Sequence, residues 1–140
     1  MPVSEGVKHA MISFYERFSS GDVSAMAELI TREEDAIVIG TDPAQWTAGR
    51  DEWIAGFQGQ VEQMPGLQMQ AGSRLQAYEE GSVGWAADEP SVVFPDGGGF
   101  PIRVTAVFRQ EGGEWKIVNA HVSIAVPDAK LEELLPQLLG

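Results

Sequence analysis

The sequence predicts an α+β domain, with three N-terminal helices packed on one face of a curved, mixed or mainly antiparallel sheet and a short helix at the C-terminus. Apolar residues recur at helical spacing as far as Pro65-Gly66, and an alternation of apolar and polar residues follows. Short turns separate the later segments, which favours antiparallel pairing of neighbouring strands. Helices followed by consecutive strands are typical of α+β proteins.

The first two helices are predicted from their caps and their apolar spacing. Ser4 can cap a helix that ends at Gly21, and Asp22 can cap a second one, so that S-S-G-D forms the hinge of a helical hairpin. The apolar positions of the two helices are Val7, Met11, Phe14 and Phe18, then Val23, Met26, Ala27 and Ile30.

A short strand and a third helix follow. Residues 31–35 are polar and acidic and predict a solvated corner. Residues 36–40 are apolar, with three β-branched residues at the centre, and predict a strand, and 41–49 are predicted to form a loop. Arg50 and Asp51 open the third helix, which Pro65-Gly66 closes.

Four strands are predicted after this helix, over residues 67–78, 83–94, 100–110 and 114–125. The last segment, 128–139, carries leucines along one helical face, interrupted by Pro136. We therefore expect one domain, 1–140, with its core at about 5–126 and a helical tail at 127–140.

Composition excludes several classes of partner and site. The chain has 140 residues and a net charge of −12, which disfavours nucleic acid and anionic membranes. It has no cysteine, and no cluster of ligands at metal-binding spacing, so neither a thiol site nor a metal is expected. No apolar run approaches the length of a membrane helix. We expect a cytoplasmic protein without a cofactor.

The last strand has two unlike faces, because side chains alternate along a strand. One face carries apolar and polar groups, as the wall of a ligand pocket does: Trp115, Ile117, Asn119, His121 and Ser123. The other face carries an apolar stripe, which predicts a homodimer contact: Val118, Ala120, Val122 and Ile124.

Three segments carry a family resemblance: S-S-G-D, then I-G-T-D-P-A-Q-W-T-A-G-R-D-E-W, then G-G-E-W-K-I-V-N-A-H-V-S. The chain resembles, over about residues 5–126, the SnoaL-like branch of the superfamily of nuclear transport factor two, ketosteroid isomerase and scytalone dehydratase. The resemblance implies a cone-shaped fold with an internal cavity. It does not imply one activity, because this fold hosts enzymes, binding modules and association domains.

Ketosteroid isomerase activity is not expected. The resemblance places the isomerase's tyrosine on Phe14, with Tyr15 adjacent, its base near Gly40, and its second acid on Ala106. These positions lack the required groups, and each such group typically contributes ~100-fold or more to the rate.

The same resemblance implies a cavity lined by aromatic and polar side chains. His121 is the candidate base or polar anchor, and Asp42, in the loop at the expected cavity mouth, is its candidate partner. Each has a structural alternative, as a hydrogen-bonded core histidine and a turn-forming aspartate. The other candidate ligand-binding residues are Phe14, Tyr15, Phe18, Trp53, Phe57, Trp85, Phe108, Asn119 and Ser123.

Two functions remain open at this point. The chain is either a binder of a small apolar organic molecule, with isomerase, cyclase or dehydratase chemistry by acid–base catalysis without a cofactor, or a non-catalytic association module. The polar trio Asn119, His121 and Ser123 favours the first function, because burying polar groups costs free energy unless they form hydrogen bonds, and a purely structural cavity would have little reason to bury three of them.

Overall fold

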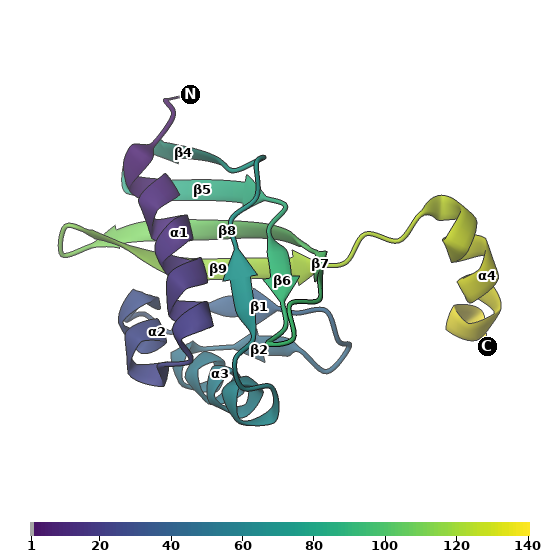
Figure 1. The fold of residues 1–140 in the computed structure, drawn as a ribbon. Helices are drawn as coiled ribbons and strands as arrows, with labels where there is room; N and C mark the ends of the chain where they lie inside the picture. Colours follow the sequence, from purple (N-terminus) through teal and green to yellow (C-terminus); the bar gives the residue numbers. More distant parts are fainter. Residues whose placement is uncertain (1) are drawn as a thin grey trace.

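The computed structural model describes residues 2–140 and confirms the α+β prediction (Figure 1). Helix α1 lies across one face of the larger sheet, with α2 and α3 beside it, and α4 stands apart from the body. The helices are α1 (Glu5–Ser20), α2 (Val23–Leu29), α3 (Arg50–Gln63) and α4 (Asp128–Leu139). The strands are β1 (Ile37–Ile39), β2 (Trp46–Ala48), β3 (Gln68–Gln70), β4 (Gln76–Glu80), β5 (Val83–Asp88), β6 (Ser91–Val93), β7 (Gly99–Pro101), β8 (Arg103–Glu111) and β9 (Glu114–Ser123).

The predicted helix ends are confirmed at the first hairpin. The Ser4 hydroxyl accepts a hydrogen bond from the Val7 N–H at 3.0 Å, and Asp22 caps α2 in the same manner through Ala25. Gly21 between the two helices has φ of +67°, a conformation that a glycine adopts without steric cost.

Nine strands form two sheets rather than one meander. The larger sheet has the order β2-β1-β9-β8-β5-β4, and a smaller one has the order β3-β6-β7. All pairs are antiparallel except β1 with β9, which are parallel. The prediction that consecutive segments simply pair in order is therefore wrong in part, and the predicted loop at 41–49 contains strand β2.

Three predicted long strands are each divided by a bend. The segments 67–78, 83–94 and 100–110 give one part to the small sheet and one part to the large sheet. Pro90 lies at the second bend and has no N–H for a ladder bond. At the first bend, a Cβ on Gly72 would lie 2.2 Å from the Glu89 carbonyl oxygen, so only glycine fits there. The bends curve the structure around a hollow interior.

A β-bulge in β9 decides which side chains face that interior. Phe108 pairs with Ile117, but its neighbour Val107 pairs with Asn119, so that Val118 is an extra residue. The alternation of side chains therefore reverses at Val118. Trp115 and Ile117 pack toward the core before the bulge, and the core-facing residues after it are Ala120 and Val122.

Candidate functional site

A cavity of about 320 Å³ lies between the large sheet, the small sheet, α1 and α3. Most of its lining is aromatic or aliphatic, as is typical of sites for small organic ligands. The aromatic part of the lining is Phe14, Phe18, Trp53, Phe57, Phe94 and Phe100. Strand β1 contributes Val38, and β9 contributes Val122 after the bulge.

The polar groups of the lining are few and uncharged. They are the hydroxyls of Thr41 and Thr47 and the amides of Gln45 and Gln60. Among residues 2–140, no acidic, basic, histidine or tyrosine side chain lines this cavity. Hydroxyls and amides can orient a ligand by hydrogen bonds, but they do not exchange protons near neutral pH.

The structure brings together four of the predicted lining residues. Phe14, Phe18, Trp53 and Phe57 lie in the cavity wall, and Phe18 and Phe57 stack with ring centroids 5.8 Å apart. Phe108 also points inward but is fully buried in the core behind the wall. The roles of these residues in ligand binding remain predictions.

The predicted placement of His121, Asn119 and Ser123 in the cavity is wrong. The bulge at Val118 turns the odd-numbered positions that follow it in β9 to the outer face of the sheet, where His121 is exposed and lies opposite Thr105 and Ile39. Trp85 lies on the same outer face, because the buried residues of β5 are the alternate ones, Gly84, Ala86 and Asp88. Simple alternation along β9 gave the opposite result because the sequence carries no signal for the extra residue.

Asp42 lies in an exposed turn between β1 and β2. Its carboxylate accepts the Ala44 N–H at 2.8 Å, and its own N–H donates to the Gln45 side-chain oxygen at 3.0 Å. Among the described residues Asp42 makes no hydrogen bond with His121, so the structure does not form the predicted acid–base pair. The turn-forming alternative for Asp42 describes its contacts.

Tyr15 is buried beside the cavity rather than in its wall. Its hydroxyl donates to a carboxylate oxygen of buried Asp88 at 3.0 Å, and that oxygen also accepts the Gly72 N–H at 2.9 Å. Burial raises the pKa of Tyr15, and the Asp88 charge and hydrogen bond raise it further. Tyr15 therefore stays protonated and ties α1 to the bend between β5 and β6, a contact that no sequence pattern signalled.

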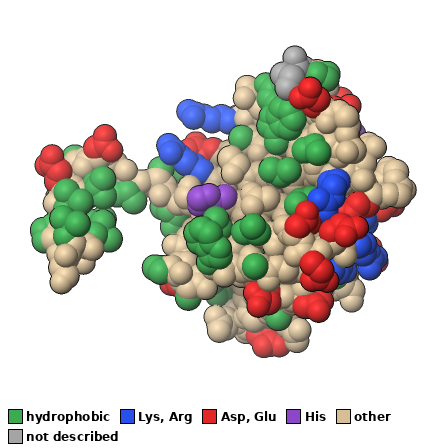
Figure 2. All heavy atoms as spheres, turned by 180° about the vertical axis from the view of Figure 1, so that it is seen from behind, with side chains coloured by type: hydrophobic (Ala, Val, Ile, Leu, Met, Phe, Trp, Pro, Cys, Tyr) green, Lys and Arg blue, Asp and Glu red, His purple; other side chains and the backbone are tan. Residues whose placement is uncertain are grey.

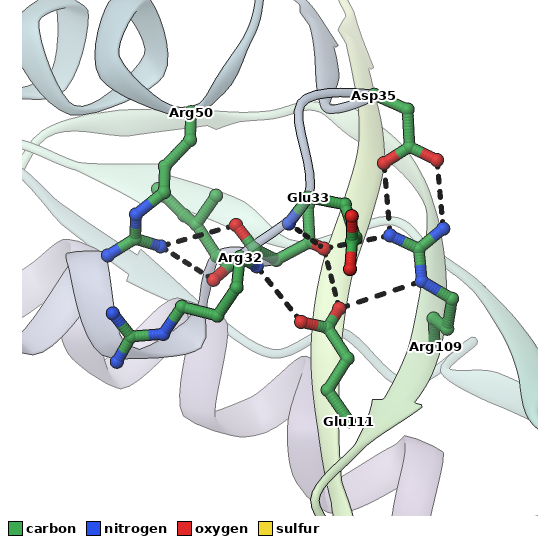
Figure 3. Close-up of polar contacts among 8 residues, drawn as sticks. Arg32, Glu33, Asp35, Arg50, Arg109 and Glu111 are labelled. Carbon is green, nitrogen blue, oxygen red and sulfur yellow. Dashed lines mark hydrogen bonds and ion pairs between the residues drawn. The ribbon is translucent and has the colours of Figure 1, made fainter.

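A polar cluster fixes the predicted corner at 31–35 against the β8–β9 hairpin (Figure 3). Arg109 donates to both carboxylate oxygens of Asp35, at 2.9 and 3.0 Å, and Glu111 accepts from the Thr31 hydroxyl and the Arg32 N–H. The hydrogen bond from Arg109 lowers the pKa of Asp35. Because Arg109 forms ion pairs with both Asp35 and Glu111, we interpret this cluster as structural.

The outer face of the large sheet carries exposed apolar side chains. Figure 2 views the molecule from behind, where apolar side chains gather over the sheet and acidic ones lie toward one side. Trp46 is 70% exposed, and its strand neighbour Ile39 shares the face with Ile37 and Trp85. The four residues predicted to form a dimer stripe do not share this face. Ala120 is fully buried and Val122 lies in the cavity wall, while Val118 is half-buried and Ile124 is exposed beyond the end of β9.

Within residues 2–140, no group of three or more histidine, aspartate or glutamate side chains is arranged to hold a metal ion. None of the described helices combines the length and apolar character needed to cross a bilayer.

The fold matches solved structures of low sequence identity. The first is from Thiobacillus denitrificans and is provisionally described as a calcium/calmodulin-dependent protein kinase type II association domain, with 19% identity, 90% of this chain and 100% of that chain covered, and a TM-score of 0.76. A protein from Streptomyces avermitilis, provisionally described as an NTF2-like dehydratase, has 21% identity, 88% and 96% coverage, and a TM-score of 0.73. An NTF2-like protein with a cystatin-like fold from Novosphingobium aromaticivorans has 21% identity, 94% and 87% coverage, and a TM-score of 0.72.

The TM-scores of these matches establish the fold, whereas identities of 19–21% do not assign an activity. No curated protein matches the chain. The family model for the SnoaL-like domain matches residues 7–127, which include every helix and strand around the cavity except the first two residues of α1. The chain therefore belongs to the SnoaL-like family, and its α+β fold matches that of a solved NTF2-like protein with a cystatin-like fold.

Proposed function

We propose that this SnoaL-like domain binds one small, largely apolar organic molecule in its cavity and holds it without acid–base chemistry. The observation that carries the proposal is the lining, which combines aromatic rings with uncharged hydroxyls and amides. Apolar burial would supply the affinity, and a few hydrogen bonds would set the orientation. An acid–base enzyme would instead need a proton-exchanging group within reach of the ligand.

The size of the cavity narrows the ligand class. About 320 Å³ is at the lower end of the usual range for small-molecule sites. The aromatic rings of Phe18, Phe57 and Trp53 in the lining favour a ligand that carries a ring of its own, because aromatic pairs attract one another in offset or tilted arrangements. We therefore expect a compact aromatic or alicyclic compound with one or two hydrogen-bonding groups.

Two glycines of α3 offer a matched test. Gly56 lines the cavity and Gly59 does not, and a Cβ added at either meets no atom within 4 Å. Both substitutions to leucine should raise the stability of α3, since glycine disfavours a helix interior by ~1 kcal/mol. Only Gly56→Leu adds bulk to the cavity.

The measurement is displacement of an environment-sensitive apolar fluorophore by a library of aromatic and alicyclic compounds. We expect binding to the wild type and to Gly59→Leu, and at least a tenfold weaker affinity for Gly56→Leu. His121→Gln should leave affinity unchanged. Equal affinities for the two glycine variants, or loss of binding in His121→Gln, would place the ligand elsewhere and refute the proposal.

A second candidate function is self-association through the outer face, and the exposure of Trp46 and Ile37 favours it. The outward positions at the centre of this face carry no carboxylate, although the chain has 21 acidic residues. Depletion of charge and enrichment of aromatic residues mark interface cores.

Sedimentation velocity tests the second function. We expect a homodimer at micromolar concentration that dissociates when Ile37, an exposed residue of β1 on the outer face, is replaced by lysine (Ile37→Lys). Gln58→Lys on exposed α3 should leave the mass unchanged. A monomeric wild type would refute the association function and leave the cavity proposal intact.

A further inference from the structure

Helix α4 leaves a leucine face without a partner. It contacts the body so little that none of its residues is buried, and Leu131, Leu134, Leu135 and Leu138 are 37–68% exposed. Figure 1 shows it standing away from both sheets at the end of an extended segment. A soluble protein rarely leaves such a stripe to water unless it docks on something.

The helix also depends on docking for its own stability. It has 12 residues, no side-chain N-cap after Pro127, and a proline at position 136. Isolated helices of this length are marginal in water, and an internal proline weakens them further. Its leucine face therefore needs a surface that is close for most of the time.

The chain brings α4 to the rim of the cavity. Val122, the second-last residue of β9, lies in the cavity wall, and four residues, 124–127, then lead to α4. Because β1 runs parallel beside β9, the chain leaves next to Thr41, which also lines the cavity. Four extended residues reach about 13 Å.

The rim offers an apolar surface of matching character. Two residues of the cavity lining, Met64 after α3 and Phe100 on β7, are 44% and 37% exposed. These are the large apolar lining residues that remain most open to solvent. Met64 follows α3 and Phe100 belongs to the small sheet, so a helix of 12 residues, about 18 Å long, presents its leucines to side chains from two different elements of the rim.

We propose that α4 closes over the mouth of its own chain's cavity, with its leucine face against Met64 and Phe100. The position described here, with α4 away from the body, is then the open state. The inference deepens the proposed function, on which its purpose rests: closure shields a bound apolar ligand from water and slows its release. The short tether gives α4 a high effective concentration at this rim.

The test uses the absence of cysteine in the chain. In the Gln137→Cys variant, the new cysteine on α4 is the single attachment site for a spin label. Methionines with labelled methyl groups then report the approach of the spin label by broadening of their resonances. Closure predicts broadening of Met64 at the rim relative to buried Met11, which lies outside the cavity lining. It also predicts no broadening when spin-labelled chains are mixed with separate methyl-labelled chains.

Two double variants separate docking of the leucine face from the intrinsic helix propensity of α4. Leu131→Gln with Leu135→Gln should abolish the broadening and speed release of a bound apolar fluorophore about tenfold. Glu132→Gln with Glu133→Gln, on the same turns, should change neither. An unbroadened Met64 in the singly labelled chain overturns the proposal, and broadening in the mixed sample assigns α4 to a second copy instead.

The two proposals fail separately. Broadening is measured without any ligand, so a lid that closes over a cavity with no detectable ligand would refute only the binding function. Tight fluorophore binding with unchanged release from the leucine variant would refute only the lid.

Discussion

The inner and outer faces of the six-stranded sheet carry different side chains over the same strands. On the inner face, β9 presents Ala120 to the core and Val122 to a cavity whose lining, among residues 2–140, has no titratable side chain. On the outer face, the same strand presents Asn119 and His121 beside exposed Trp46 and Ile37. The composition of the inner face is compatible with the proposed apolar ligand, and that of the outer face with the proposed contact with a second copy of the chain.

One extra residue creates this division. Without the bulge at Val118, the residues that follow it would point to the opposite faces. His121 would then point to the inner face and place an imidazole, a hydrogen-bonding group, among apolar side chains. The difference teaches that the chemistry of this cavity is set by strand register as much as by which residues the strand contains.

The largest difference in stability is expected between two variants that place a negative charge on the inner and on the outer face of β9. Ala120→Asp puts a carboxylate at a fully buried position, whereas Asn119→Asp puts it on the outer face. We expect Ala120→Asp to lower the free energy of unfolding by about 3–5 kcal/mol. Asn119→Asp should cost under about 1 kcal/mol. Urea denaturation measures both, and equal losses would contradict the assigned faces.

The two tyrosines give a smaller contrast of the same kind. Tyr15→Phe removes a hydrogen bond to buried Asp88 and should cost about 1–3 kcal/mol. Tyr78 lies half-buried on β4, opposite Trp85, and its hydroxyl makes no hydrogen bond among the described residues. Tyr78→Phe should therefore be close to neutral in a thermal melt. A loss in Tyr78→Phe that matched that in Tyr15→Phe would remove the special role of the Asp88 contact.

The smallest effect concerns the acid dependence of the hairpin beyond the bulge. Burial alone would raise the pKa of Glu111, but hydrogen bonds from Thr31 and Arg32 and the charges of Arg109 and Lys116 lower it. A pKa lowered by folding stabilises the protein above the unfolded value, and this contribution is lost as the pH falls through the folded value.

Glu111→Gln should therefore cost about 1 kcal/mol at pH 7. Its stability should also fall less steeply than that of the wild type from about pH 5 to pH 3. Urea midpoints across this range measure the difference. Parallel curves for the two proteins would show that Glu111 has the same pKa in the folded and unfolded states.

Sequence reasoning predicted the helices well because caps and helical spacing are local signals. Ser4, Gly21 and Asp22 act at the predicted ends, and Phe14, Phe18, Trp53 and Phe57 lie in the cavity wall as expected. The prediction of which face each β9 side chain takes was wrong, because it depends on contacts between segments far apart in the sequence. The bulge at Val118 depends on the pairing of β9 with Val107, 11 residues earlier in the chain. The Tyr15–Asp88 contact joins residues that are 73 positions apart.

The most direct test of the binding site is the response of methionine methyl groups to a bound apolar ligand. Met26, Met64 and Met69 line the cavity, whereas Met11 is buried away from it and His121 lies on the outer face. A titration followed by methyl and imidazole resonances should shift the three cavity methionines and leave Met11 and the His121 ring unchanged. A shift of the His121 ring with unmoved cavity methionines would contradict the account.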